Sequence, residues 1–205
     1  MDAGQNGSFG CCQTGRCPVA HADEIPTEFR MQMTITYTRN VSMVKAVDAE
    51  TYTAPGCNYE YNAYANSTHP EQLGTETWTV DEDKEFLFGV GHMHSGALNV
   101  SVFLNDEFVC ASYPIYGKTP SKVGDEKGHL VEVTFCLDDG TVGRHGGYPD
   151  HPGGYRNRSL AVKKGDKLRV DGWYWVGQDD GRISPMPAGP HLGVMSYFYG
   201  LYAAT

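Results

Sequence analysis

The sequence lacks a long apolar run: no stretch approaches the ~20 residues that cross a bilayer, so we expect no membrane span. Basic residues are scarce, since 16 Lys and Arg stand against 25 Asp and Glu, and no basic cluster exceeds Lys163-Lys164. The resulting net charge of −9 argues against nucleic acid and against an anionic membrane surface as partners. No Cys-x-x-Cys pair is present, which disfavours a cysteine-rich zinc site and thioredoxin-like redox chemistry.

Helical patterning is also missing, because no segment keeps a 3.6-residue apolar period. Short alternating runs between turn residues recur instead, which is typical of β-strands. These runs are residues 28–39, 46–53, 58–63, 75–80, 85–90, 98–104, 107–116, 129–137, 160–162, 167–176 and 193–204. Their spacing predicts an all-β fold, a jelly-roll-like antiparallel β-sandwich. We expect a single domain over residues 26–205, preceded by a Gly- and Cys-rich arm over residues 1–25.

The six cysteines form an even set without metal-site spacing, which favours disulfides. Cys110 and Cys136 lie in expected strands joined by a loop that can fold back, so we predict a bond between them. Cys11, Cys12, Cys17 and Cys57 then pair among themselves in one of three ways and tie the arm to the sandwich. Adjacent cysteines rarely bond each other, so we favour Cys57 bonding Cys11 or Cys12.

Five of the eight asparagines begin an Asn-x-Ser/Thr sequon in which x is not proline. They are Asn6, Asn40, Asn66, Asn99 and Asn157. Together with the cysteines, these sequons predict a secreted, extracellular glycoprotein that carries N-linked glycans. The first residues lack the basic start and apolar core of a secretory signal, so we expect a mature chain or a piece of a longer one.

One stretch stands out as a candidate metal site: Gly89-Val90-Gly91-His92-Met93-His94 at the end of an apolar run. In an extended chain, His92 and His94 point to the same face a few ångströms apart, as two corners of a metal site would. Most short His-x-His motifs are accidental, and two hydrogen-bonded strand histidines are the alternative interpretation. The glycines in this stretch indicate a bulge or the close approach of another segment.

A second candidate stretch lies before the last expected strand, where His191 is followed four residues later by Met195. A strand methionine is core filler more often than a ligand. At a loop–strand junction, however, Met195 could join two imidazoles. Two imidazoles and a thioether suit copper, especially Cu(I), better than zinc, calcium or magnesium.

Several motifs follow one another in a distinctive order: His92-x-His94, then residues 162–168, then residues 191–199. Further blocks accompany them along most of the chain, namely Phe9-Gly10-Cys11-Cys12, Gly56-Cys57-Asn58-Tyr59, residues 109–117 and Val133-Thr134-Phe135-Cys136. In this order they resemble the plant stress-up-regulated nodulin family (nodulin nineteen). From about Thr75 onward the chain is more distantly similar to the second copper domain of peptidylglycine hydroxylating monooxygenases.

The monooxygenase resemblance implies copper as cofactor. In that domain a His-x-His and a late Met hold the copper that activates oxygen, which implies His92, His94 and Met195 as ligands here. His191 stands in a loop whose spacing departs from that domain, and we expect the three ligands to leave an open position that solvent, oxygen or His191 could take. The separate electron-donating copper domain has no counterpart in this chain. We therefore expect copper binding rather than catalysis by this chain alone, and assign no catalytic residue.

Two hypotheses follow. The first is a secreted glycoprotein with a mononuclear copper site of the monooxygenase type. The second is an extracellular structural or interaction glycoprotein that keeps the fold without catalysis, with the extracellular matrix or self-association as its candidate partners. Copper content of the purified protein, followed by reductant-driven oxygen consumption, discriminates between them.

Overall fold

The computed structural model describes residues 30–35, 37–56, 60–64, 70–117, 130–137, 142–143, 160–177 and 191–204. Within these ranges the chain forms strands and one short 3₁₀-helix, η1. The elements are η1 (Val41–Met43), β1 (Asp48–Thr53), β2 (Tyr61–Ala63), β3 (Glu71–Thr79), β4 (Lys84–Met93), β5 (Ala97–Leu104), β6 (Glu107–Ser112), β7 (Pro114–Tyr116), β8 (Leu130–Val133), β9 (Phe135–Leu137), β10 (Val142–Gly143), β11 (Leu160–Val162), β12 (Lys167–Trp175), β13 (His191–Val194) and β14 (Ser196–Ala204).

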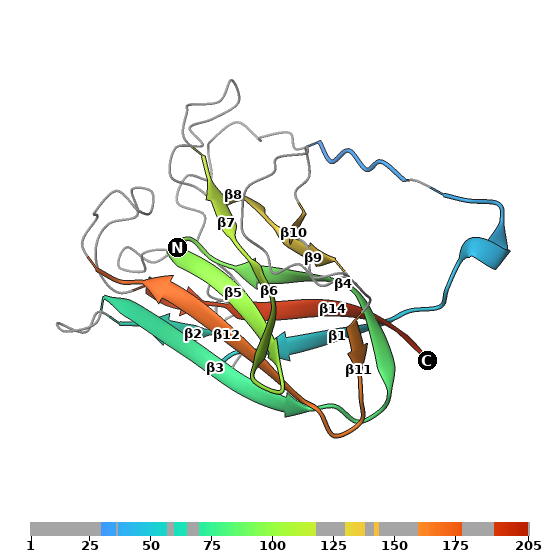
Figure 1. The fold of residues 1–205 in the computed structure, drawn as a ribbon. Coiled ribbons are helices and arrows are strands. Elements are labelled where there is room, and N and C mark those ends of the chain that lie inside the picture. Colours follow the sequence, from blue (N-terminus) through green and yellow to red (C-terminus); the bar gives the residue numbers. More distant parts are fainter. Residues whose placement is uncertain are drawn as a thin grey trace, which may run out of the picture.

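The strands form two larger sheets that face each other as layers (Figure 1). One sheet has six strands in the order β1-β14-β4-β9-β10, with β11 also paired to β4. The other has four strands in the order β3-β12-β5-β6. β2 pairs with β13 and β7 pairs with β8 in two smaller sheets, and all these pairs are antiparallel. The predicted all-β, antiparallel sandwich is confirmed. Over the described ranges, no helix has the length and apolar character needed to cross a membrane.

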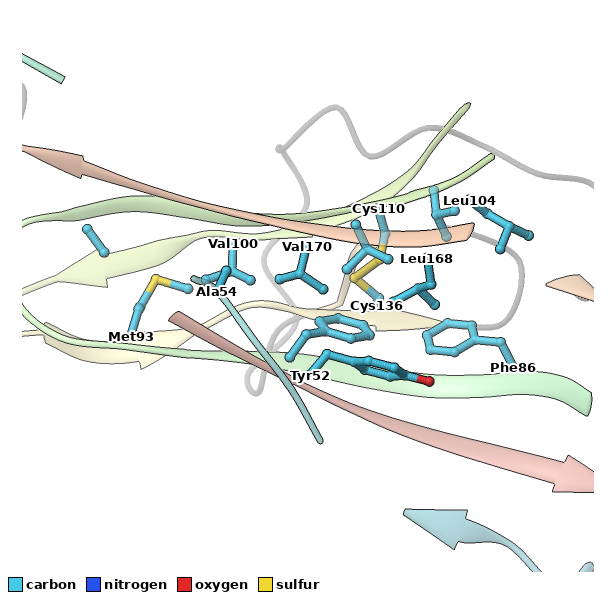
Figure 2. Packing of buried hydrophobic residues seen from close by; sticks show 14 of the residues in the cluster. Tyr52, Ala54, Phe86, Met93, Val100, Leu104, Cys110, Cys136, Leu168 and Val170 are labelled. Carbon is cyan, nitrogen blue, oxygen red and sulfur yellow. A yellow bond between two sulfur atoms is a disulfide. The ribbon is translucent and has the colours of Figure 1, made fainter. Parts of the chain in front are cut away.

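The core lies between the two layers (Figure 2). Val100, Leu168 and Val170 come from the four-stranded sheet, and Tyr52 and Phe86 meet them from the six-stranded sheet. These side chains have less than a tenth of their surface exposed, so the hydrophobic effect of their burial holds the layers together.

Gly91 marks a point of close approach between the layers. A Cβ atom on Gly91 would lie only 2.9 Å from the Cβ atoms of Val100 and Ser112. The Gly91 N–H also donates to Ser112 Oγ at 2.8 Å. The expectation that a glycine in this stretch indicates a close neighbour is confirmed, because a larger residue would push β4 away from the opposite sheet.

The turn between β5 and β6 is formed by Asn105 and Asp106, the two residues that separate the expected strands over residues 98–104 and 107–116 and predict a hairpin turn there. Both residues have positive φ, 52° and 65°. Two consecutive residues of this kind are typical of the tight hairpin turns that match the twist of paired strands. The hairpin places β6, and with it Cys110, at the edge of the four-stranded sheet.

The expected strand over residues 28–39 is wrong for the described part of that range, because residues 30–35 and 37–39 lie in no strand. The segment runs out to the side of the sandwich before it returns through η1 to β1 (Figure 1). Alternation of apolar residues produces a strand only where a neighbouring edge accepts its backbone groups, and none of the described strands pairs with this segment. Residues 28, 29 and 36 lie outside the described ranges.

One disulfide joins the two layers. Cys110 in β6 bonds Cys136 in β9, with 6.0 Å between their Cα atoms, and both residues are fully buried. The predicted Cys110–Cys136 bond is confirmed. Cys11, Cys12, Cys17 and Cys57 lie outside the described ranges, so their pairing stays a prediction.

We predict that replacing both Cys110 and Cys136 by alanine lowers the free energy of unfolding by about 2–4 kcal/mol. The bond spans a sequence separation of 26 residues and restricts the unfolded chain accordingly. Denaturant unfolding of the parent and the double variant measures the difference. Coincident unfolding curves would contradict a stabilising role for this bond.

Candidate metal centre

His92 and His94 share a face of the six-stranded sheet, as their spacing predicts. His92 is paired with Tyr197, and the next residue, Met93, is paired with Ser196. Met93 is buried in the core, so alternation turns the side chain of His92 to the opposite, exposed face. The ring centres of His92 and His94 lie 5.5 Å apart, which brings the two imidazoles together at the end of β4.

Two imidazoles at this separation fit a shared metal ion. A metal–imidazole bond is about 2 Å long, so an ion lies roughly 3 Å from the centre of each ring. Two rings can then hold one ion when their centres are up to roughly 6 Å apart, and the observed 5.5 Å lies within that limit.

Met195 lies next to the same corner of the sheet. It is half-buried and directly precedes β14, one residue beyond the paired Ser196 and Met93. The hydroxyl of Tyr174 accepts a hydrogen bond from the His94 N–H at 2.9 Å and donates one to the Met195 carbonyl oxygen. The backbones of His94 and Met195 are therefore neighbours, linked through a single oxygen atom.

Two tyrosines of β14 surround His92. The Tyr197 ring is stacked on the His92 ring, with centres 5.6 Å apart and an interplanar angle of 28°. The Tyr199 ring meets His92 edge-on at 6.4 Å. Neither tyrosine was predicted from the sequence to be part of the site. Their spacing from Met195 could have predicted it, because residues two and four positions apart in a strand lie on one face.

The surroundings of His92 favour its neutral form. Partial burial lowers the pKa of His92, and repulsion from His94 lowers it further. Neutral imidazole is the form that binds metals, so a lowered pKa leaves this ligand available in mildly acidic solution.

The remaining predicted ligand, His191, begins β13, where it is paired with Ala63. Its side chain lies outside the described part of the structure, so its role as a ligand stays a prediction. Among the described residues, no group of three or more His, Cys, Asp or Glu side chains could hold a metal ion. A metal held by His92 and His94 would need further donors, for which the sequence predicts the Met195 thioether and His191.

Two of the five predicted glycosylation sites lie in the described ranges. Asn40 is exposed and precedes η1, and its Oδ1 accepts hydrogen bonds from the Ser42 N–H and Oγ. Asn99 is half-buried in β5 and accepts a hydrogen bond from Ser101 Oγ at 2.8 Å. Asn6, Asn66 and Asn157 lie outside the described ranges.

We predict that His92 titrates below the usual histidine pKa of about 6.5, because the folded protein disfavours its charged form. Between the pKa of His92 in the unfolded chain and its lower pKa in the folded protein, the unfolded chain binds more protons. The contribution of His92 to stability therefore falls as pH falls through that window. A pH series of histidine NMR spectra measures the midpoint. His94→Gln should raise the midpoint, since it removes the repulsion. A parent midpoint above the usual value would contradict the burial of His92.

Comparison with known proteins gives one family. The family model described as "Stress up-regulated Nod 19" matches residues 11–203. No curated protein matches the chain. The predicted resemblance to the nodulin family is confirmed, while the distant link to the monooxygenase copper domain stays a prediction. Because the match covers nearly the whole sequence, this chain belongs to the stress up-regulated Nod 19 family.

Proposed function

We propose that this chain is a secreted glycoprotein that binds one copper ion through His92, His94 and Met195. One observation carries the proposal. Where β4 meets β14, the His92 and His94 rings lie 5.5 Å apart, and the backbone of Met195 lies beside them. The two histidines and the methionine are about a hundred residues apart in sequence, and the pairing of β4 with β14 places their backbones at one corner of the sheet.

The donor set supports copper over other metals. Imidazole nitrogens suit copper and zinc, whereas a thioether sulfur adds a preference for Cu(I). Calcium and magnesium favour oxygen ligands, and structural zinc sites use four nitrogen or thiolate donors. When bound, copper supplies one-electron redox chemistry. The residues of this chain would hold the ion, and the lowered pKa of His92 would keep that ligand neutral.

Two features support secretion and glycosylation. The buried Cys110–Cys136 disulfide is of the kind that persists in oxidising, extracellular compartments. Five sequons offer acceptor asparagines, and Asn40 among them is exposed. A glycan on Asn99 would keep the surface around it free of protein contacts.

We predict that His92→Ala and His94→Ala each weaken copper binding at least about tenfold, since each removes one of only three donors. Met195→Leu should weaken Cu(I) more than Cu(II), because the thioether favours the softer ion. Competition titration with chromophoric chelators measures both affinities. Met93→Leu is the matched control, because Met93 is paired beside the site but its side chain is buried in the core. Parent-like copper affinity in all three ligand variants would refute the site.

A second candidate function, self-association, is favoured by the segment that leaves the sandwich. Met31, Met33, Ile35 and Tyr37 expose between 72 and 90 % of their surfaces. In an extended conformation these alternate residues form one apolar face, the pattern of a strand without a partner. We propose that this segment pairs with the edge strand β1 of a second copy. Among the described residues, β1 pairs with β14 alone.

Charge supports this choice of partner. Arg30 and Arg39 bracket the segment, and residues 31–38 carry no charge. The edge strand β1 carries Asp48 and Glu50, of which Glu50 already bonds Lys84. A basic apolar strand therefore meets an acidic edge, which favours addition of the segment to that edge.

We predict a concentration-dependent dimer in sedimentation velocity experiments on the glycosylated protein. The double variant Met33→Asp and Ile35→Asp should be monomeric, because it places two carboxylates in the apolar face. Thr34→Asp, one residue away on the other face, is the control and should dimerise like the parent. A parent that stays monomeric at every concentration, or a double variant that dimerises, would rule this contact out.

A further inference from the structure

Tyr174 connects the four-stranded sheet to the proposed metal site. It lies in β12, where it is paired with Ala97 of β5 and with Gln72 of β3. Its side chain is fully buried, and its hydroxyl reaches the backbone of the opposite sheet at the end of β4 and just before β14. The site on the outer face is thus supported from behind by a residue of the second layer.

The hydroxyl of Tyr174 takes the place of a backbone hydrogen bond. The described pairing between β14 and β4 begins with Ser196 and Met93, and the next pair would be Met195 with His94. At that position the Tyr174 oxygen accepts from the His94 N–H and donates to the Met195 carbonyl. Burial raises the pKa of Tyr174, so the phenol keeps the proton that it donates to Met195.

The neighbours of Tyr174 leave little freedom at this point. A Cβ atom on Gly172 would lie 2.0 Å from Ser196 Oγ, so the layers approach too closely there for a larger residue. Ser196 Oγ is also hydrogen-bonded to the Tyr61 hydroxyl at 2.8 Å, and the Tyr61 ring packs edge-on against Tyr174. Ser196, the residue that follows Met195, is therefore held between the backbone of β12 at Gly172 and the Tyr61 side chain of β2.

We propose that Tyr174 is a positioning residue that sets the separation of His94 and Met195, and thereby the preference of the site for Cu(I) over Cu(II). This inference rests on the proposed copper site. The two histidines alone bind either oxidation state, and the thioether adds affinity mainly for Cu(I). A change in the backbone spacing between His94 and Met195 moves the sulfur relative to the imidazoles and so alters the preference.

Tyr174→Phe tests this role, because it removes the hydroxyl and keeps the ring. Tyr116→Phe is the matched control. The Tyr116 hydroxyl makes the same pair of bonds nearby: it accepts from the Gly96 N–H at 3.0 Å and donates to the Ala97 carbonyl at 2.8 Å. The control therefore loses equivalent hydrogen bonds in the turn that follows His94, without touching the backbone of Met195.

We predict that Tyr174→Phe weakens Cu(I) binding by about tenfold or more, as the loss of a group that orients metal ligands does, with a smaller change for Cu(II). The affinity for Cu(I) divided by the affinity for Cu(II) should then fall in Tyr174→Phe and stay at the parent value in Tyr116→Phe. In a Met195→Leu background, Tyr174→Phe should no longer change the ratio, since the sulfur through which it acts is gone. General destabilisation would not produce that dependence on Met195.

A metal-free measurement accompanies the titrations. Hydrogen exchange followed by NMR should show faster exchange of the His94 amide in Tyr174→Phe than in the parent or in Tyr116→Phe. If Tyr174→Phe does not fold, 3-fluorotyrosine at position 174 keeps the hydroxyl but weakens it as an acceptor from the His94 N–H and strengthens it as a donor to the Met195 carbonyl. It should then speed exchange of the His94 amide and change the affinity ratio from the parent value.

The outcomes separate the two proposals. A parent that binds no copper overturns the metal site, and the role of Tyr174 with it. A parent that binds copper while folded Tyr174→Phe, or the fluorotyrosine protein, keeps the parent affinity ratio overturns the positioning role alone.

Discussion

The pairing of β14 with β4 is the constraint on which the rest of the structure depends. β14 lies between β1 and β4, and β4 in turn carries β9 and β11. The ladder runs from Ser196 and Met93 at one end to Ala204 and Lys84 at the other. If β4 slipped by one residue against β14, Met93 would turn outward and His92 would turn into the core. The same pairing that buries the core thus decides which side chains can bind a ligand.

The two faces of the β4–β14 strand pair have different roles. Core side chains such as Phe198 and Tyr202 pack against the opposite sheet, and the Cys110–Cys136 bond links the layers covalently. The outer face carries His92, with Tyr197 stacked against it. Tyr174 connects the two, because it is buried in the core yet hydrogen-bonded to the backbone of His94 and Met195. The proposed ligands therefore lie near solvent while their backbones are held by buried groups.

The sequence predicted the features that depend on local pattern. The period of two placed His92 and His94 on one face, and the Asn105-Asp106 pair indicated the hairpin turn. The sequence did not predict which side chains surround the site, namely Tyr197, Tyr199 and Tyr174. Strand order in a sandwich depends on contacts between segments that are distant in the sequence. Nothing in the sequence around Tyr174 shows that its hydroxyl lies behind His94. The strand predicted around Ile35 is wrong for the opposite reason: its alternation is that of a strand, but none of the described strands pairs with it.

X-ray absorption spectroscopy of the Cu(I)-loaded protein tests the central claim most directly, because it identifies the donor atoms. A site formed by His92, His94 and Met195 predicts imidazole nitrogen scattering together with one sulfur scatterer, which should disappear in Met195→Leu. The Met93→Leu protein should keep that sulfur. Absence of sulfur scattering in the parent, or its persistence in Met195→Leu, would contradict a copper site formed where β4 meets β14.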